Sequence, residues 1–105
     1  MSEILKKLGE VLEDRKTKAS SESYVSSLYD KGIGEICDKV DEESKELIIA
    51  LKTESNDRIV SEAADLWFHS LIALSMKNLS SDDILLELEK SFGISGHDEK
   101  TERNT

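Results

Sequence analysis

The sequence predicts an all-α protein, a bundle of about five helices. The 105 residues include no proline and five glycines, and the chain is rich in Glu, Lys, Leu and Ser, a composition that favours helix. Apolar residues recur every three or four positions in five successive segments. Because a chain of this length forms one domain with a modest core, we expect a homodimer to complete the bundle.

The first two helices are predicted before residue 31. The first covers about Ser2–Arg15, where leucine and isoleucine residues share one face. A polar segment follows, and Ser23 is a suitable N-cap for a short second helix that ends near Asp30. The run Lys31-Gly32-Ile33-Gly34 then predicts a break in the chain.

The third and fourth helices are predicted to form a central antiparallel pair. The third runs from about Glu35 to Leu51, with Glu43 inside its apolar stripe, and residues 52–57 are expected to form a loop. The fourth runs from about Arg58 to Met76 and is apolar on most sides, including Trp67 and Phe68. We therefore expect it at the centre of the bundle, with both aromatic residues packed.

The fifth helix follows a turn at residues 77–79. Ser80 or Ser81 is expected to cap it, and it is predicted to end near Phe92. Residues 1–94 would then form the domain, and residues 95–105 would form a polar tail that we expect to be mobile.

The overall charge and the single cysteine exclude several functions. A formal charge of −9 argues against binding to nucleic acid or to an acidic membrane surface, whereas a free nucleotide remains possible. Cys37 alone can form neither a disulfide within the chain nor a thiolate metal cage. No apolar run is long enough for a signal peptide or a membrane span, so we expect a cytoplasmic protein.

Two pairs of acids stand out on the central helices. Glu43 and Glu46 lie three residues apart on one helix, and Glu62 and Asp65 do so on the next. Antiparallel packing would let the four carboxylates converge, and oxygen ligands of this kind suit Mg²⁺, or alternatively Mn²⁺. The competing interpretation is a solvated face or a buried ion pair with Lys39 or Lys45.

Other polar groups have two interpretations each. His69 is either a core histidine with one hydrogen bond or a residue that orients Asp65 or the substrate. The cations Arg15, Lys16 and Lys18, close to Ser23, either complement the dipole of the first helix or form an anion site at the start of the second.

Several segments resemble the phosphoribosyl-ATP pyrophosphohydrolases, which belong to the all-α MazG-like nucleotide pyrophosphohydrolases. They are SESYVSSLYDKG, KVDEESKELIIA, SEAADLWFH and the terminal SFGISGHDEKTER, in the same order as in that family. The resemblance implies Mg-dependent hydrolysis of phosphoribosyl-ATP to phosphoribosyl-AMP and pyrophosphate, the second step of histidine biosynthesis. It also implies a dimer, with phosphoribosyl-AMP cyclohydrolase on a separate chain.

The resemblance assigns roles to individual residues. The metal ligands would be Glu43, Glu46, Glu62 and Asp65. In the mechanism that we expect from these acids and the resemblance, one carboxylate, Glu46 or else Glu42 or Glu43, would hold the attacking water and accept its proton. The substrate would be bound by Arg15, Lys16, Ser23, Tyr24, Lys39 and Lys100, and possible support would come from Arg103.

Two other functions compete with this one. The same acids would serve a house-cleaning pyrophosphohydrolase of non-standard nucleoside triphosphates, because the chemistry at the phosphates is shared. Alternatively, the chain is a non-enzymatic helical interaction module whose carboxylates are structural, in which case Mg²⁺ would not raise its melting temperature.

Overall fold

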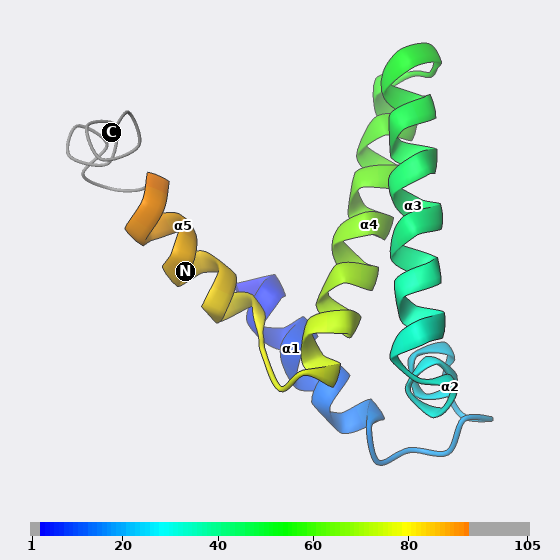
Figure 1. The fold of residues 1–105 in the computed structure, drawn as a ribbon, viewed down its shortest axis with the longest axis vertical. Coiled ribbons are helices and arrows are strands. Elements are labelled where there is room, and N and C mark those ends of the chain that lie inside the picture. The colour runs from blue at the N-terminus through cyan, green and yellow to red at the C-terminus, as the bar shows by residue number, and fades with distance from the viewer. Residues whose placement is uncertain (1–2, 93–105) are drawn as a thin grey trace.

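The computed structural model describes residues 3–92, which contain five α-helices joined by short connections (Figure 1). They are α1 (Glu3–Arg15), α2 (Tyr24–Lys31), α3 (Ile33–Thr53), α4 (Asn56–Met76) and α5 (Ser81–Phe92). The all-α class and the order of the helices confirm the prediction. The predicted tail, residues 95–105, lies outside the described residues and includes Lys100 and Arg103.

Helices α3 and α4 lie side by side as an antiparallel hairpin (Figure 1). Only Glu54 and Ser55 separate them, so the predicted loop over residues 52–57 is wrong. The Thr53 hydroxyl donates a 3.0 Å hydrogen bond to the Ile49 carbonyl, which helps to continue α3. The Ser55 hydroxyl accepts from the amide of Arg58 and caps α4 two residues earlier than the sequence predicts.

The break between α2 and α3 is shorter than the four residues expected. Gly32 alone separates the helices. Its φ of 95° lies in a region of backbone conformation that residues with a Cβ atom rarely adopt. Its amide still donates to the Leu28 carbonyl, and Ile33 already belongs to α3. One glycine is therefore sufficient to redirect the chain.

Helix α4 ends in a Schellman motif. Asn78 has a left-handed φ of 61° and donates to the Ser75 carbonyl, while Leu79 donates to the Leu74 carbonyl. Next, the carboxylate of Asp83 accepts a 2.8 Å hydrogen bond from the amide of Ser80 at the start of α5. The predicted turn at residues 77–79 agrees with this geometry. The bonds found at the start of α5 run from Ser80 to Asp83, so a cap by the side chain of Ser80 or Ser81 stays a prediction.

The core lies where α1 and α2 meet one end of the hairpin. Its buried members are Leu12, Val25, Leu28, Ile36, Leu71 and Ile72. Tyr29 ties the same region together, because its hydroxyl donates to the Leu12 carbonyl and also hydrogen bonds the Ser75 hydroxyl. Ser23 caps α2 as predicted. This packing fixes α2 beside the hairpin.

Large apolar side chains remain uncovered at the other end of the hairpin and on α5, which diverges from α4 (Figure 1). Phe68 packs against the core as predicted, but Trp67 is 64% exposed. The prediction that Trp67 is packed is therefore wrong for a single chain, since a pocket of about 360 Å³ remains open between α4 and α5 beside it. Among residues 3–92, no helix combines the length and apolar character needed to cross a membrane.

Candidate functional site

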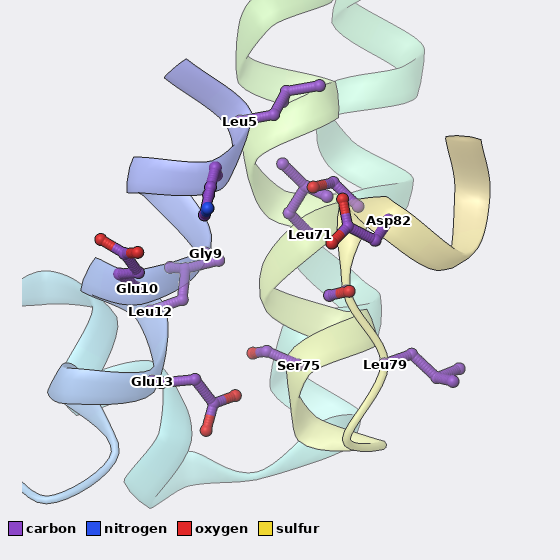
Figure 2. Close-up of a pocket in the computed structure, with 12 residues that line it drawn as sticks. Leu5, Gly9, Glu10, Leu12, Glu13, Leu71, Ser75, Leu79 and Asp82 are labelled. Carbon is purple, nitrogen blue, oxygen red and sulfur yellow. The ribbon is translucent and has the colours of Figure 1, made fainter. Parts of the chain in front are cut away.

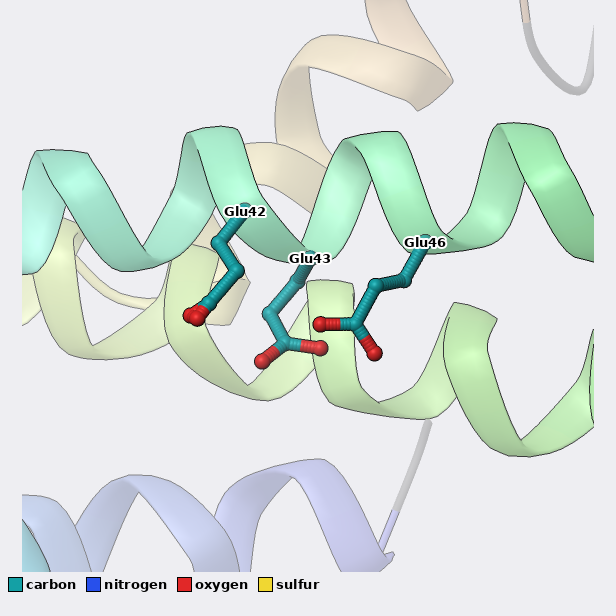
Figure 3. Close-up of side chains that lie close together, drawn as sticks. All are labelled: Glu42, Glu43 and Glu46. Atoms are coloured by element: carbon teal, nitrogen blue, oxygen red, sulfur yellow. The ribbon is translucent and has the colours of Figure 1, made fainter.

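The hairpin brings acidic side chains of α3 and α4 together. Carboxylate oxygens of Glu43, Glu62 and Asp65 lie within 4.8 Å of one another. Glu43 also belongs to a second group on α3, with Glu42 and Glu46, and Figure 3 shows these three side chains reaching toward α4. We call the first group the hairpin triad and the second the α3 triad.

The structure distributes the four acids predicted from the sequence, Glu43, Glu46, Glu62 and Asp65, over the two triads. Glu46 lies in the α3 triad beside Glu42, whereas Glu62 and Asp65 lie in the hairpin triad. Glu43 is shared by both and is thus the central acid of the site. Glu62 is buried, Glu43 is partly buried, and the other acids are exposed, so the site runs from the helix interface to the surface.

Two buried oxygens at this site have no hydrogen-bond partner among the described residues: Oε1 of Glu43 and Oε1 of Glu62. Burial raises the pKa of Glu43, and the charges of Glu46 and Asp65 raise it further, while His69 lowers it. Unpaired buried carboxylate oxygens are costly, and hard divalent cations bind through such oxygens. The residues of the hairpin triad therefore fit a metal ion of this class.

One cation contacts the hairpin triad, and the sequence analysis missed it. The guanidinium of Arg58 forms an ion pair with Oε2 of Glu62 and lies 3.5 Å from a carboxylate oxygen of Glu54. The i,i+4 spacing of Arg58 and Glu62 was the available signal. Lys39 and Lys45, the ion-pair partners that the sequence analysis considered for the paired acids, bind other residues. Lys39 pairs with Glu42 at 3.4 Å, and Lys45 pairs with Asp41.

His69 connects the acids to α2. Its Nδ1 lies 2.8 Å from the Asp65 carbonyl, which can only accept, so a neutral ring carries its proton on Nδ1. The hydroxyl of Tyr24 then donates to Nε2 of His69, also at 2.8 Å. His69 thus contacts the backbone of Asp65 rather than its carboxylate.

Tyr24 and Lys39 are the predicted substrate ligands that lie near the acids. Burial raises the pKa of the Tyr24 phenol, the nearby Lys39 lowers it, and Glu43 and Glu42 raise it. The pKa of Lys39 is raised, first by its hydrogen bond to Glu42. Half of Tyr24 remains exposed, so its ring can still contact a ligand.

Arg15 and Lys16 already have acidic partners. Arg15 pairs with Asp14 at 2.6 Å, and Lys16 pairs with Glu13 at 2.9 Å and also donates to Asn78. Asn78 follows the end of α4 at Met76. At about 1.5 Å per residue, that end lies roughly 17–21 Å along the helix from Asp65 and Glu62 of the hairpin triad. These cations could therefore reach only the distant part of an extended substrate, and their binding role stays a prediction.

A pocket of about 440 Å³ lies between α1 and the residues that lead into α5 (Figure 2). Leu5, Leu12, Leu71 and Asp82 are among the residues that line it. Among residues 3–92, none of the predicted metal or substrate ligands belongs to its lining. The open surface over the two triads, rather than this pocket, is thus the candidate functional site.

Comparison with known proteins identifies the family. The family model described as phosphoribosyl-ATP pyrophosphohydrolase matches residues 5–92. The chain belongs to the phosphoribosyl-ATP pyrophosphohydrolase family. The resemblance found in the sequence is thereby confirmed, and the matched residues include all the acids of both triads.

Similar members of the family are named phosphoribosyl-ATP pyrophosphatase. The protein of Vesicomyosocius okutanii is 52% identical over 104 residues, which cover 99% of both chains. That of Hydrogenovibrio crunogenus is 50% identical, over 98% of this chain and 95% of its own. That of Methylococcus capsulatus is 46% identical, over 96% of both chains. The likeness therefore extends over nearly the whole of each protein.

Proposed function

We propose that this protein hydrolyses phosphoribosyl-ATP to phosphoribosyl-AMP and pyrophosphate, the second step of histidine biosynthesis, in the cytoplasm. The observation that carries the proposal is the hairpin triad, which presents oxygen ligands suited to a cation that binds phosphates. Family membership and the names of the relatives specify the substrate.

The proposed cofactor is Mg²⁺, which Mn²⁺ could replace. Glu43, Glu62 and Asp65 would hold it, with Glu46 supplying a further oxygen from the α3 triad. When bound, the ion supplies charge neutralisation for the leaving pyrophosphate and polarises the phosphorus under attack. The buried oxygens of Glu43 and Glu62 that lack hydrogen bonds support this assignment.

The exposed acids of the α3 triad are suited to handle water. Glu46 and Glu42 are accessible and lie beside Glu43, so either carboxylate could orient a water molecule and accept its proton. Lys39 would contribute positive charge to the phosphates, and Tyr24 would contact the sugar or base. Arg15, Lys16, Ser23 and Lys100 are proposed for the more distant parts of the substrate.

A homodimer is proposed from the apolar surface that one chain leaves exposed. Ile48, Ile49, Leu51, Val60 and Trp67 on the hairpin are all at least 49% exposed. Monomeric soluble proteins seldom leave this many large apolar side chains exposed on one helical hairpin, and a second copy of the chain would cover them. The cyclohydrolase that acts next in the pathway is proposed as a functional neighbour, because it would use the phosphoribosyl-AMP that this protein releases.

The decisive experiment is an assay of pyrophosphate release from phosphoribosyl-ATP with Mg²⁺, beside a panel of ordinary and modified nucleoside triphosphates. Wild-type protein should act on phosphoribosyl-ATP, and Asp65→Asn should lose activity by about 100-fold or more because a ligand charge is removed. Asp57→Asn, the same change at an exposed position of α4 outside both triads, should retain activity.

Other results would assign a different function. Release from the other triphosphates alone would indicate a house-cleaning enzyme with the same metal chemistry. Folded protein that is inactive on every substrate, and whose melting temperature does not rise with Mg²⁺, would indicate an interaction module.

A further inference from the structure

Arg58 occupies a position that helix stability alone does not favour. It is the third residue of α4 after the Ser55 cap, where a positive charge opposes the helix dipole. Its partner Glu62 lies four residues later, and this order of charges is weaker than the reverse. The position of Arg58 is therefore not explained by the stability of α4, and the surroundings of Glu62 must account for this ion pair.

The burial of Glu62 supplies that explanation. Glu62 is 4% exposed, so its carboxylate has lost nearly all contact with water. Oε2 pairs with Arg58, while Oε1 has no hydrogen bond among residues 3–92. Losing the only partner of a buried carboxylate is strongly destabilising, so Arg58 compensates a charge that the fold would otherwise leave unpaired.

The guanidinium of Arg58 is also well placed to separate from Glu62. More than half of its side chain is exposed, and Glu54 offers the guanidinium a second acidic partner, on the surface at the end of α3. In the part of the chain that the structure describes, every other ion-paired lysine or arginine pairs with an acid outside the hairpin triad. Arg58 is thus the cation that any metal ion must meet at Glu62.

We infer that Arg58 is an exchangeable counter-ion of the metal site. In the metal-free protein it holds the buried carboxylate of Glu62 in place. A divalent cation that binds the hairpin triad takes over this carboxylate, and the guanidinium moves to the Glu54 side. Arg58 thereby stabilises the empty site and lowers the affinity of the site for metal. This inference rests on the metal site in the proposed function.

The test is a calorimetric titration of metal-stripped protein with Mn²⁺, without nucleotide. Arg58→Gln removes the competing charge, so it should bind Mn²⁺ about three- to tenfold more tightly than wild type. The same variant should melt at a lower temperature in EDTA, because Glu62 is then unpaired. Arg58→Lys keeps the charge and should restore both values. Lys45→Gln, which breaks an exposed i,i+4 pair with Asp41, should change neither.

Arg58→Gln that binds Mn²⁺ with unchanged or weaker affinity would overturn the inference while the metal site stands. Wild-type protein that binds no Mn²⁺ would overturn the metal site and the inference together. If Arg58→Gln fails to fold, the wild type still provides a test. The Nε–H NMR signal of Arg58, assigned by its loss in Arg58→Lys, should shift on addition of Mg²⁺, and an unmoved signal contradicts the exchange.

Discussion

The hydroxyl of Tyr24 on α2 lies 2.8 Å from Nε2 of His69 on α4 and donates this hydrogen bond when the histidine ring is neutral. The other ring nitrogen of His69 is bound to the carbonyl of Asp65. This chain of two bonds fixes the position of a half-exposed phenol relative to the acids. While the ring of His69 is neutral, the phenol donates its proton to the histidine. The oxygen of Tyr24 is therefore left as an acceptor toward a ligand, such as a sugar hydroxyl.

Tyr24→Phe tests this connection. The change leaves the buried Nε2 of His69 without its partner, so the free energy of unfolding should fall by about 1 kcal/mol. If the phenol also contacts the substrate, kcat/KM should fall by about tenfold, with most of the effect in KM. Urea denaturation and steady-state kinetics with phosphoribosyl-ATP measure the two effects.

Tyr29→Phe is the matched control, since Tyr29 makes its hydroxyl bonds to Leu12 and Ser75 in the core. It should lose comparable stability and retain kcat/KM. Equal kinetic losses in the two variants would show that Tyr24 acts only through stability.

The raised pKa of Glu43 predicts how the metal-free protein responds to pH. Glutamate in an unfolded chain ionises near pH 4.3, whereas burial and neighbouring acids keep Glu43 protonated to higher pH in the folded state. Its contribution to stability is therefore fully present below that pH and is lost as the pH rises through the folded pKa. In EDTA, Glu43→Gln should become progressively more stable than wild type between pH 4 and pH 8.

Urea unfolding of both proteins across this range provides the measurement. Addition of Mn²⁺ at pH 8 should make the wild type the more stable of the two proteins, because only the wild type keeps the Glu43 carboxylate that binds the metal. A stability difference that is constant with pH would contradict the raised pKa.

Lys39 and Lys45 form a pair of comparable lysines on α3, each bound to an acid of its own helix. Lys39 lies beside Tyr24 and Glu42, so Lys39→Ala should raise KM for phosphoribosyl-ATP by about tenfold through loss of a phosphate contact. Lys45→Ala should leave KM unchanged. The same rise in both variants would indicate a general effect of net charge instead of a contact.

Trp67 reports on the proposed dimer, because it is the only tryptophan and is exposed in one chain. If a second copy covers it, dilution of the protein should shift its fluorescence to longer wavelength as the dimer dissociates. Ile49→Glu, which places a charge at another exposed apolar residue of the hairpin, should give the long-wavelength spectrum at every concentration if the dimer covers both residues. Sedimentation measures the mass in parallel, and a dimer with solvent-exposed Trp67 would place the interface elsewhere.

Most of the fold could be predicted from local chemistry, but the junctions between helices could not. Ser23 precedes an apolar segment and caps α2 as expected. At residues 52–57, polarity alone suggested a loop, yet polar residues are also good helix formers. The hydroxyl bonds of Thr53 and Ser55 decide where α3 ends and α4 begins, and composition does not specify them.

The acids of the site were predictable for a different reason. A short connection makes two adjacent helices antiparallel, and residues three apart share one side of a helix, so Glu43 could be expected to approach Glu62 and Asp65. The same pattern did not indicate that Glu46 would lie with Glu42 instead. The link between Tyr24 and His69 spans 45 residues and depends on how α2 packs, so no local pattern indicates it. Arg58 was missed because its polar helical face resembles an ordinary solvated surface.

The two-residue connection between α3 and α4 also determines the order in which the site can assemble. Glu43 and Glu62 are separated by about twenty residues, so bringing them together closes a short loop at low entropic cost. Contacts between residues this close in sequence form early in folding. The contact of Tyr24 with His69 closes a loop more than twice as long and is expected to form later. The acids are thus expected to meet in the first folding event of the chain, and the tyrosine is expected to join a hairpin that already holds them.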